Sequence, residues 1–326
     1  MAREMMYGEA IATAITEEME RDSSVVFYGQ NLAMTERDPF LRKFGKKRVR
    51  IAPISETAET GVAVGAAMTG LRPIVELWMS EFMLVAFDEL INEAPRLRYM
   101  SGGQVKVPLV FKAGYGFAAG WAGQHSNCVY HTMMGVPGLK IALPSTAADA
   151  KGLMTAAIRD DNPVIYLHHY MLTLEKGPVP EGDHVVPFGI ADVKRAGTDV
   201  TIVATGWMVK KSLAAAELLA GQGVSAEVVD PRTLAPLDVE TILKSVKKTG
   251  RLVLVDQATR HASAAAIIAA EMAEHGLEAL KAPVKMVTAL DTSIPFSEPL
   301  ETYVLPSEEK IVAAVKSVIA KQAATV

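Results

Sequence analysis

The sequence contains a single cysteine, Cys128, in 326 residues. One cysteine cannot form an internal disulfide, so a reducing compartment, the cytoplasm, is the expected location. Cys128 has no neighbouring base that would activate it, and we expect a buried structural thiol. No stretch approaches the roughly 18 consecutive apolar residues that a membrane span requires. The N-terminus also lacks the charged-then-apolar pattern of a secretory signal.

The chain has no large excess of charge of one sign. The formal net charge is −4 and the sequence pI is about 6.0, so nothing favours nucleic acid as a partner. No Walker sequence and no GxGxxG follows an expected strand, which disfavours a nucleotide-binding module. The pair His168-His169 and His261 lack partners at the spacing of metal ligands, so no catalytic metal site is expected.

Apolar residues are plentiful. They make up 50% of the chain and the mean hydropathy is +0.20. Because no membrane segment accounts for this surplus, large subunit interfaces are expected.

Short β-branched runs alternate with longer helical patterns, which predicts an α/β fold with parallel sheets flanked by helices. Strands are expected over 25–28, 73–77, 107–112, 139–143, 164–168, 199–204, 225–229, 251–256 and 284–288. Helices are expected over 7–21, 55–69, 82–99, 147–159, 209–222, 238–247, 263–274 and 307–320.

A domain boundary is expected in the segment 172–187, which is rich in proline, glycine and charge and poor in periodicity. Strands precede and follow it in similar number. The sequence therefore predicts two doubly wound domains with mainly parallel sheets, over residues 1–186 and 187–326.

Two carboxylates, Glu56 and Glu59, stand at the start of an expected helix made of glycine, alanine and valine. Acidic residues in a first helical turn complement the helix dipole, and this explains them without any further role. Alternatively, the small side chains allow another chain to approach closely, and a carboxylate at such a dry interface would have a raised pKa and could hold a proton. Local rules leave both interpretations open.

Two further segments are candidate functional sites. The stretch 113–126 is rich in glycine and aromatic residues and follows an expected strand, and its His125 could serve as an acid, a base or a hydrogen-bond donor. A structural histidine that caps a loop is the alternative. The stretch 157–163 turns from a helix end into a strand, and carbonyls there with Asp160 and Asn162 could hold a cation. An ordinary polar turn is the alternative.

Several separated motifs occur together. They are PISE (53–56), GVAVGAA (61–67), GLRP (70–73), YMSGG (99–103), QHS (124–126), PGLK (137–140), DAKGL (149–153), AIRD (157–160) and DPRTLAPLD (230–238). With them the chain, from about residue 6 onward, resembles the β subunit of the thiamine-diphosphate decarboxylase component of 2-oxo acid dehydrogenase complexes. That family covers pyruvate, branched-chain and acetoin dehydrogenases, and transketolase is a relative. The fold it implies is a transketolase pyrimidine-binding domain followed by a transketolase C-terminal domain.

The resemblance implies a heterotetramer of two α and two β chains that shares thiamine diphosphate between an α and a β subunit. In the family the α subunit holds the diphosphate and Mg²⁺ with a GDG motif followed by an asparagine. Here the pair Gly182-Asp183 stands in the expected linker with no suitable asparagine after it. The chain is therefore expected to be inactive without its α partner, and a lipoyl acyltransferase core is a further expected partner.

The same resemblance assigns roles to single residues. Glu56 matches the glutamate that hydrogen-bonds the ring nitrogen of the cofactor's aminopyrimidine and helps the cofactor deprotonate its own reactive carbon. Phe82 and Trp78 match residues that pack on or beside the pyrimidine, and His125 matches the histidine that orients substrate or the incoming lipoyl group. Glu59 falls where the family has an aromatic or apolar residue and inherits no role. A structural K⁺ site is implied at the carbonyls of Leu109, Ala157, Ile158 and Asp160, with Asn162.

The chain departs from the family near the expected cofactor. Gln30 stands where the family has an acidic residue that contacts the cofactor region. Ser80 replaces an aromatic residue, the stretch 112–116 (KAGYG) replaces an arginine-glycine-proline sequence, and His168 stands where glutamate is common. These changes leave the cofactor expectation in place but weaken any assignment of pyruvate as the substrate.

The default expectation is oxidative decarboxylation of a 2-oxo acid with acyl transfer to lipoamide. Cleavage of acetoin or another 1,2-dicarbonyl-type compound is a close alternative. A split transketolase subunit is disfavoured because no cluster of histidine and arginine suits a sugar phosphate. A non-catalytic scaffold is the remaining alternative, favoured by Gln30 and Ser80 and disfavoured by the presence of Glu56 and His125.

Overall fold

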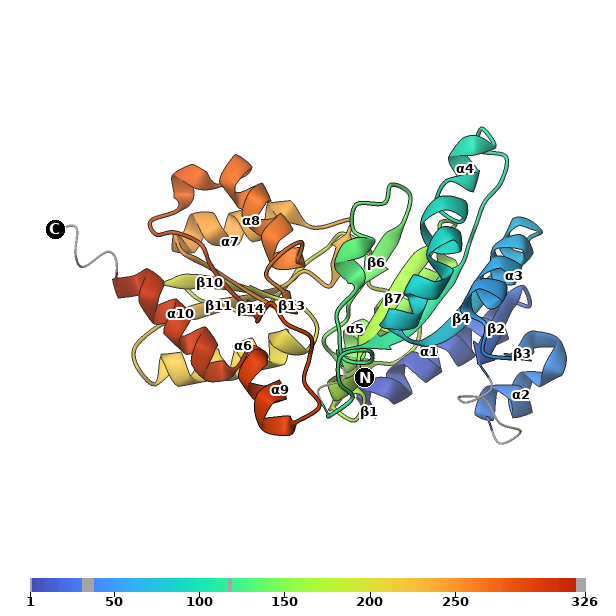
Figure 1. Ribbon diagram of the computed structural model, residues 1–326, viewed down its shortest axis with the longest axis horizontal. Helices are drawn as coiled ribbons and strands as arrows, with labels where there is room; N and C mark the ends of the chain where they lie inside the picture. Colours follow the sequence, from blue (N-terminus) through green and yellow to red (C-terminus); the bar gives the residue numbers. More distant parts are fainter. Residues whose placement is uncertain (1, 31–37, 117–118, 321–326) are drawn as a thin grey trace. The chain divides into compact units, whose positions relative to one another are not determined.

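The chain divides into two compact units in a computed structural model that describes residues 2–30, 38–116 and 119–320 (Figure 1). The first unit comprises Met1–Tyr115 and Thr132–Phe188, and the second comprises Gly116–His131 and Gly189–Val326. Residues 116–131 thus belong to the second unit, although they precede the expected linker. The boundary at 186/187 stays a prediction.

A parallel sheet forms the centre of the first unit, with strands in the order β6-β7-β5-β4-β2-β3. Buried β-branched and aromatic side chains fill its strands, as in sheets covered on both faces. A separate antiparallel pair joins β1 and β8. The strands are β1 (Ala2–Met6), β2 (Val25–Gln30), β3 (Val49–Ala52), β4 (Arg72–Met79), β5 (Val110–Tyr115), β6 (Lys140–Ala142), β7 (Val164–His169) and β8 (Lys176–Pro180).

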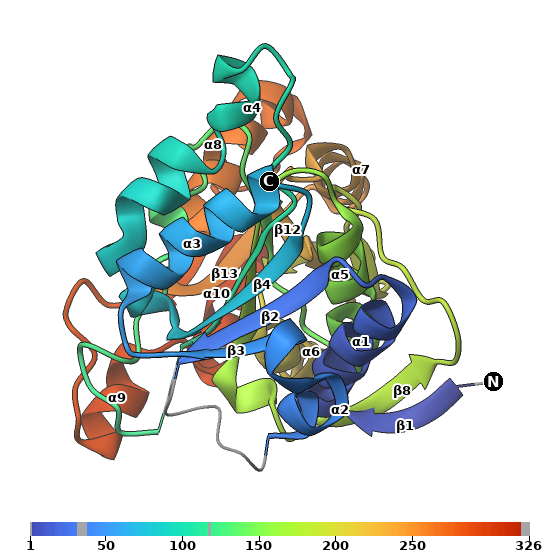
Figure 2. The same ribbon diagram turned by 90° about the vertical axis from the view of Figure 1, so that its right-hand side faces the viewer.

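Helices cover both faces of this sheet. Helices α1 and α5 pack against each other on one face, and α3 with the segment 80–100 lies on the other (Figures 1 and 2). The helical elements are α1 (Tyr7–Arg21), α2 (Pro39–Arg48), α3 (Glu56–Met68), the 3₁₀ helix η1 (Ser80–Ala86), the π-helix η2 (Glu89–Glu93), α4 (Leu97–Met100), the 3₁₀ helix η3 (Tyr130–Thr132), α5 (Ala147–Arg159) and the 3₁₀ helix η4 (Tyr170–Leu172).

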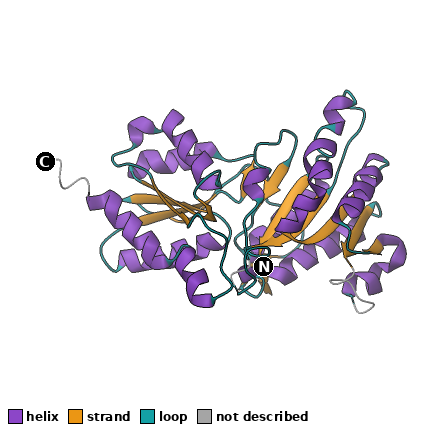
Figure 3. Ribbon diagram, viewed as in Figure 1, coloured by secondary structure: helices purple, strands orange, loops and turns teal. Residues whose placement is uncertain are grey.

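The second unit has its own five-stranded sheet in the order β14-β13-β10-β11-β9, parallel except for the edge strand β9. Helices α6 and α10 bury one face of it, and α7 and α8 bury the other (Figure 3). The elements are β9 (Asp192–Arg195), β10 (Val200–Ala204), α6 (Trp207–Ala220), β11 (Ala226–Asp230), β12 (Thr233–Ala235), α7 (Val239–Thr249), β13 (Leu252–Thr259), α8 (Ala264–His275), η5 (Leu277–Ala279), β14 (Lys285–Ala289), α9 (Glu298–Val304) and α10 (Glu308–Ala320).

The expected α/β fold with two doubly wound domains is confirmed, but one expected helix is wrong. The segment 82–99 does not form a continuous α-helix. It winds as η1, η2 and α4 in turn, and a turn at Pro95 separates the last two. Proline supplies no backbone N–H and so removes one bond of the helical ladder. Within the described ranges, no helix is both long and apolar enough to cross a membrane.

A buried charge links the two helices on one face of the first sheet. Glu18 of α1 accepts hydrogen bonds from Arg159 at the end of α5, with Nη2–Oε1 at 2.7 Å, and from Arg21. Burial raises the pKa of Glu18, but the hydrogen bonds from Arg159 and Arg21 outweigh it and hold that pKa below its ordinary value. The ion pair is therefore part of what fixes α1 against α5.

Replacing Glu18 by alanine should lower the free energy of unfolding at pH 7 by about 1–3 kcal/mol. This is less than the loss expected on breaking a fully buried ion pair, because both guanidinium groups are partly exposed. Because the pKa of Glu18 is lowered on folding, this stabilisation is present above pH 4.5, its ordinary pKa, and is lost as the pH falls below that value. Denaturant midpoints at pH 7 and pH 4 measure it. Glu20→Ala, which removes an exposed partner of Lys43, is the control, and equal midpoints for both variants would contradict the role of Glu18.

Candidate functional site

Two neighbouring strands of the first sheet end at the expected cofactor residues. Strand β2 ends at Gln30 and β4 ends at Met79, and the register pairs Gly29 with Glu76. Both strands run in the same direction, so their carboxyl ends share one edge of the sheet. Open α/β sheets bind ligands at this edge.

The backbone is irregular where β4 ends. Trp78 has a φ of 57°, in the left-handed region, and the register of β4 against β5 shifts between Glu76 and Met79. Phe82 follows at once in η1, and the side chains of both aromatic residues are partly exposed. Such strain in a bulky residue and such bulges are concentrated at binding sites, where they aim a side chain. The sequence predicts that these two aromatic residues lie at the cofactor site, but no feature of the sequence predicts the strained backbone at Trp78.

Glu56 is the first residue of α3 and its side chain is buried, with 8% of the residue exposed. Its Oε1 accepts a hydrogen bond of 2.8 Å from the Gln30 side-chain amide, and Gln30 itself is 2% exposed. The positive end of the helix dipole lies next to this carboxylate. Sequence reasoning named these two residues separately, and the structure brings them into direct contact.

Glu59 lies one turn further along α3, on the same side as Glu56, and is 4% exposed. Neither of its carboxyl oxygens has a hydrogen-bond partner among the described residues. Burial raises the pKa of Glu59 to about 7, and the charge of Glu56 adds to the rise. The Ser55 backbone amide and the Gln30 side chain oppose it in part without reaching hydrogen-bond geometry. Sequence reasoning treated Glu59 as structural, and only its burial distinguishes it.

Strands β4 and β5 carry an ion pair near the same edge. Lys112 lies opposite Glu76 in the sheet register, and the two form a largely buried salt bridge. His168 of β7 lies near enough to Lys112 to feel its charge. Burial, together with that charge, holds the pKa of His168 well below the ordinary value. The departures from the family at 112 and 168 are thus a paired ammonium and a neutral imidazole. Sequence reasoning did not foresee the partnership with Glu76.

His125 belongs to the second unit, in the segment 116–131. The Glu301 carboxylate accepts a hydrogen bond of 3.1 Å from the Gly120 amide and so anchors this segment. The imidazole ring is partly exposed and lies 6.1 Å, centroid to centroid, from the ring of Trp121. Cys128 is a buried thiol, as expected.

The expected K⁺ ligands already have partners. Arg72 Nη1 donates to the carbonyls of Ile158 and Asp160, at 3.1 and 3.0 Å. The remaining donors are also engaged: Leu109 O by Val164, Ala157 O by the Asp160 amide, the Asp160 carboxylate by Lys140, and Asn162 Oδ1 by Arg98. Cationic side chains therefore supply positive charge where the ion is expected, and the K⁺ site stays a prediction. Within the described ranges, no cluster of three histidine, cysteine or acidic residues suits a metal ion.

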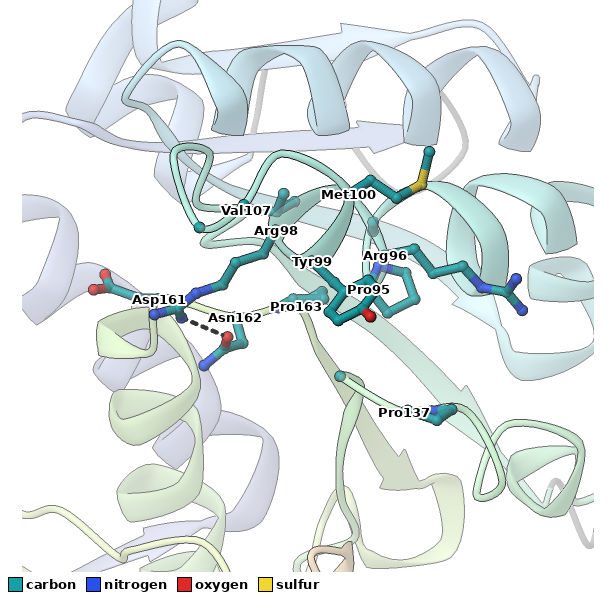
Figure 4. Close-up of a pocket in the computed structure, with 14 residues that line it drawn as sticks. Pro95, Arg96, Arg98, Tyr99, Met100, Val107, Pro137, Asp161, Asn162 and Pro163 are labelled. Carbon is teal, nitrogen blue, oxygen red and sulfur yellow. Dashed lines mark hydrogen bonds between the residues drawn. The ribbon is translucent and has the colours of Figure 1, made fainter.

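A separate cavity of about 1070 Å³ opens beside this polar turn (Figure 4). Tyr99, Met100 and Pro137 contribute apolar walls, and the Arg98–Asn162 hydrogen bond closes one end. Tyr99 is 90% exposed. The cavity contains neither Glu56 nor Glu59, so it is not the site of the expected chemistry.

Comparison with known families fits this geometry. Residues 3–173 match the family model for the transketolase pyrimidine binding domain, and residues 189–311 match that for the transketolase C-terminal domain. A solved structure titled "Split gene transketolase, inactive beta4 tetramer" shares the fold, with a TM-score of 0.79, 24% identity and coverage of 97% of this chain and 98% of that chain. The fold and the paired domains define a protein of the transketolase class.

Full-length relatives narrow the class. The chain is 43% identical over 332 residues to the acetoin:2,6-dichlorophenolindophenol oxidoreductase subunit beta of Cupriavidus necator, covering 97% of this chain and 98% of the relative. It is 44% identical over 315 residues to the pyruvate dehydrogenase E1 component subunit beta of Rickettsia felis, covering 95% and 97%. The chain belongs to the β subunits of the thiamine-diphosphate-dependent decarboxylase component of 2-oxo acid dehydrogenase complexes, which confirms the resemblance.

Glu59→Gln should stabilise the protein at alkaline pH and not at acidic pH. The pKa of Glu59 rises from 4.5 to about 7 on folding, so the wild type loses stability as the pH rises between these values, and glutamine cannot ionise. The difference in unfolding free energy between the variant and the wild type should be more favourable to the variant above pH 7 than at pH 4.5, by at most about 3 kcal/mol. Melting temperatures from pH 4.5 to 8.5 measure this, and a pH-independent difference would contradict the shifted pKa.

Proposed function

We propose that this chain, together with an α subunit, forms a thiamine-diphosphate enzyme that cleaves the C–C bond next to a carbonyl group. The default reaction is oxidative decarboxylation of a 2-oxo acid with acyl transfer to lipoamide. The observation that carries the proposal is the buried carboxylate of Glu56, which begins α3 at the carboxyl edge of the sheet and is held by Gln30. The family membership supplies the cofactor class.

The residues fit the pyrimidine half of the cofactor. Glu56 offers a buried carboxylate, and Trp78 and Phe82 offer partly exposed rings for an aromatic ligand. Gln30 orients the carboxylate. When bound, thiamine diphosphate supplies the carbon nucleophile and stabilises the electron pair that C–C cleavage leaves behind. The diphosphate and Mg²⁺ would be held mainly by the α subunit, because this chain lacks the expected motif.

Within this proposal Glu56 holds or moves a proton at the pyrimidine ring nitrogen. A hydrogen bond between a carboxyl group and a ring nitrogen is stronger in a dry site than in water, because the local dielectric is low. His125 would orient the substrate or the incoming lipoyl group, as a donor or acceptor of hydrogen bonds.

Partner subunits would cover the exposed face of α3. Gly61, Val62, Gly65 and Met68 are exposed there, and small or apolar side chains allow close packing of another chain. We assign this face to subunit contacts with the α subunit and a second β subunit. A lipoyl acyltransferase core as a further partner and a cytoplasmic location, the latter supported by the single cysteine, belong to the same proposal.

Acetoin or another 1,2-dicarbonyl-type compound is the second candidate substrate. It is favoured because the relative from Cupriavidus necator is named for acetoin and matches nearly the whole chain. The reconstituted pair should be assayed with 2-oxo acids, acetoin and ketose phosphates and an artificial electron acceptor. Turnover of ketose phosphates alone would favour a split transketolase, and failure of the pair to bind thiamine diphosphate would leave only the scaffold interpretation.

Replacing Glu56 by glutamine should reduce turnover of the reconstituted α and β subunits by at least about 100-fold, the scale of a lost acid–base group. Deuterium exchange at the cofactor's reactive carbon should slow by a similar factor. Glu20→Gln is the control, because Glu20 is an exposed acid that pairs with Lys43 away from α3. Equal losses in both variants would remove Glu56 from the proposed role.

Replacing His125 by alanine should lower the rate of acyl transfer about 10- to 100-fold while thiamine-diphosphate affinity changes less than about threefold, because the histidine is assigned to substrate and not to cofactor. Single-turnover decarboxylation and transfer to free lipoamide, measured separately, check this. Loss of cofactor affinity instead would show that His125 supports the cofactor site.

A further inference from the structure

In the part of the chain that the structure describes, Glu59, the second acid of α3, is buried without the partners that buried acids usually have. Glu59 is buried on the same side of the helix as Glu56, and both of its carboxyl oxygens lack a hydrogen-bond partner among the described residues. A buried polar group without a partner destabilises the folded state. Other acids of this unit have partners: the buried Glu18 is paired with two arginines, the buried Asp149 accepts a hydrogen bond from Thr146, and the partly buried Glu76 is paired with Lys112.

Gln30 connects the two acids. Its amide donates to Glu56 Oε1 at 2.8 Å, and the same side chain lies close enough to Glu59 to lower its pKa in part. The charge of Glu56 acts in the opposite direction and raises the pKa of Glu59. A proton on Glu59 removes this repulsion between the two carboxylates.

Within the described residues, no cation relieves this repulsion. The elements packed against α3 carry the acids Glu76 on β4, Glu81 on η1, and Glu89 and Glu93 on η2. Glu76 is neutralised by Lys112, and the cation of β4 itself, Arg72, pairs with Asp161. The described groups that shift the pKa of Glu59 include no lysine or arginine. A proton is therefore the counter-charge that remains for Glu59.

We propose that Glu59 is a positioning residue that holds one proton beside Glu56, so that the two acids carry a single negative charge when Glu56 contacts the cofactor's pyrimidine ring. This inference rests on the proposed function. Binding a ring against Glu56 removes the remaining water from that carboxylate, which strengthens its repulsion with an ionised Glu59. An enzyme in which Glu59 has ionised must then take up a proton as the cofactor binds.

The test is calorimetric titration of the reconstituted α and β subunits with thiamine diphosphate and Mg²⁺ between pH 6.5 and 8.5. Buffers of different ionisation enthalpy report the protons taken up. The wild type should take up more protons at pH 8 than Glu59→Gln does, and its affinity should fall more steeply with rising pH, at most about tenfold per pH unit. Glu59→Asp should retain the uptake, and Glu20→Gln, at an exposed acid paired with Lys43, should match the wild type.

Two results would overturn the inference. If the wild type and Glu59→Gln show the same proton count and the same pH profile, Glu59 is only structural, since a structural loss lowers affinity equally at every pH. If Glu59→Gln does not assemble with the α subunit, the wild type alone provides the test. The inference is then overturned if the wild type takes up no more protons at pH 8 than at pH 6.5. Failure of the wild type to bind thiamine diphosphate would end the proposed function and this inference with it, which is a distinct outcome.

Discussion

The hydrogen bond from Gln30 to Glu56 joins the end of strand β2 to the first residue of helix α3. It requires β2 and α3 to be placed by the whole sheet, because 26 residues separate the two partners. The parallel register of β2 with β4 places the irregular end of β4, with Trp78, at the same edge. A buried carboxylate at a helix start therefore depends on the packing of the entire first unit.

Burial has opposite consequences for acids that look alike in the sequence. Glu18 is buried between two arginines and has a lowered pKa, whereas Glu59 is buried with no cation beside it among the described residues and has a raised pKa. The difference lies in the neighbours that distant elements supply: α5 brings the cation Arg159 to Glu18, whereas β2 brings only the uncharged amide of Gln30 near Glu59. The first acid fixes a helix pair, and the second is the titratable group beside the proposed cofactor contact.

Much of the framework could be predicted from sequence periodicity. Helices α1 (7–21) and α5 (147–159) begin and end where the sequence pattern predicts them. Buried strands such as β10 and β13 follow from short β-branched runs between turn residues. The segment 80–100 could not be predicted as it is, because its 3₁₀ and π turns depend on packing against α3 and β4 and not on a local repeat.

The sequence by itself determined the α/β class, because local periodicity carries that information, and its joint motifs determined, through their resemblance to known proteins, the family and Glu56 as the candidate acid. Only the tertiary structure decided that Glu59 has no hydrogen-bond partner among the described residues, that Lys112 neutralises Glu76 and that Arg72 contacts the carbonyls expected to bind K⁺. It also placed residues 116–131 with the second unit. The physical reason is that burial and charge pairing depend on neighbours far away in the chain, which no local pattern encodes.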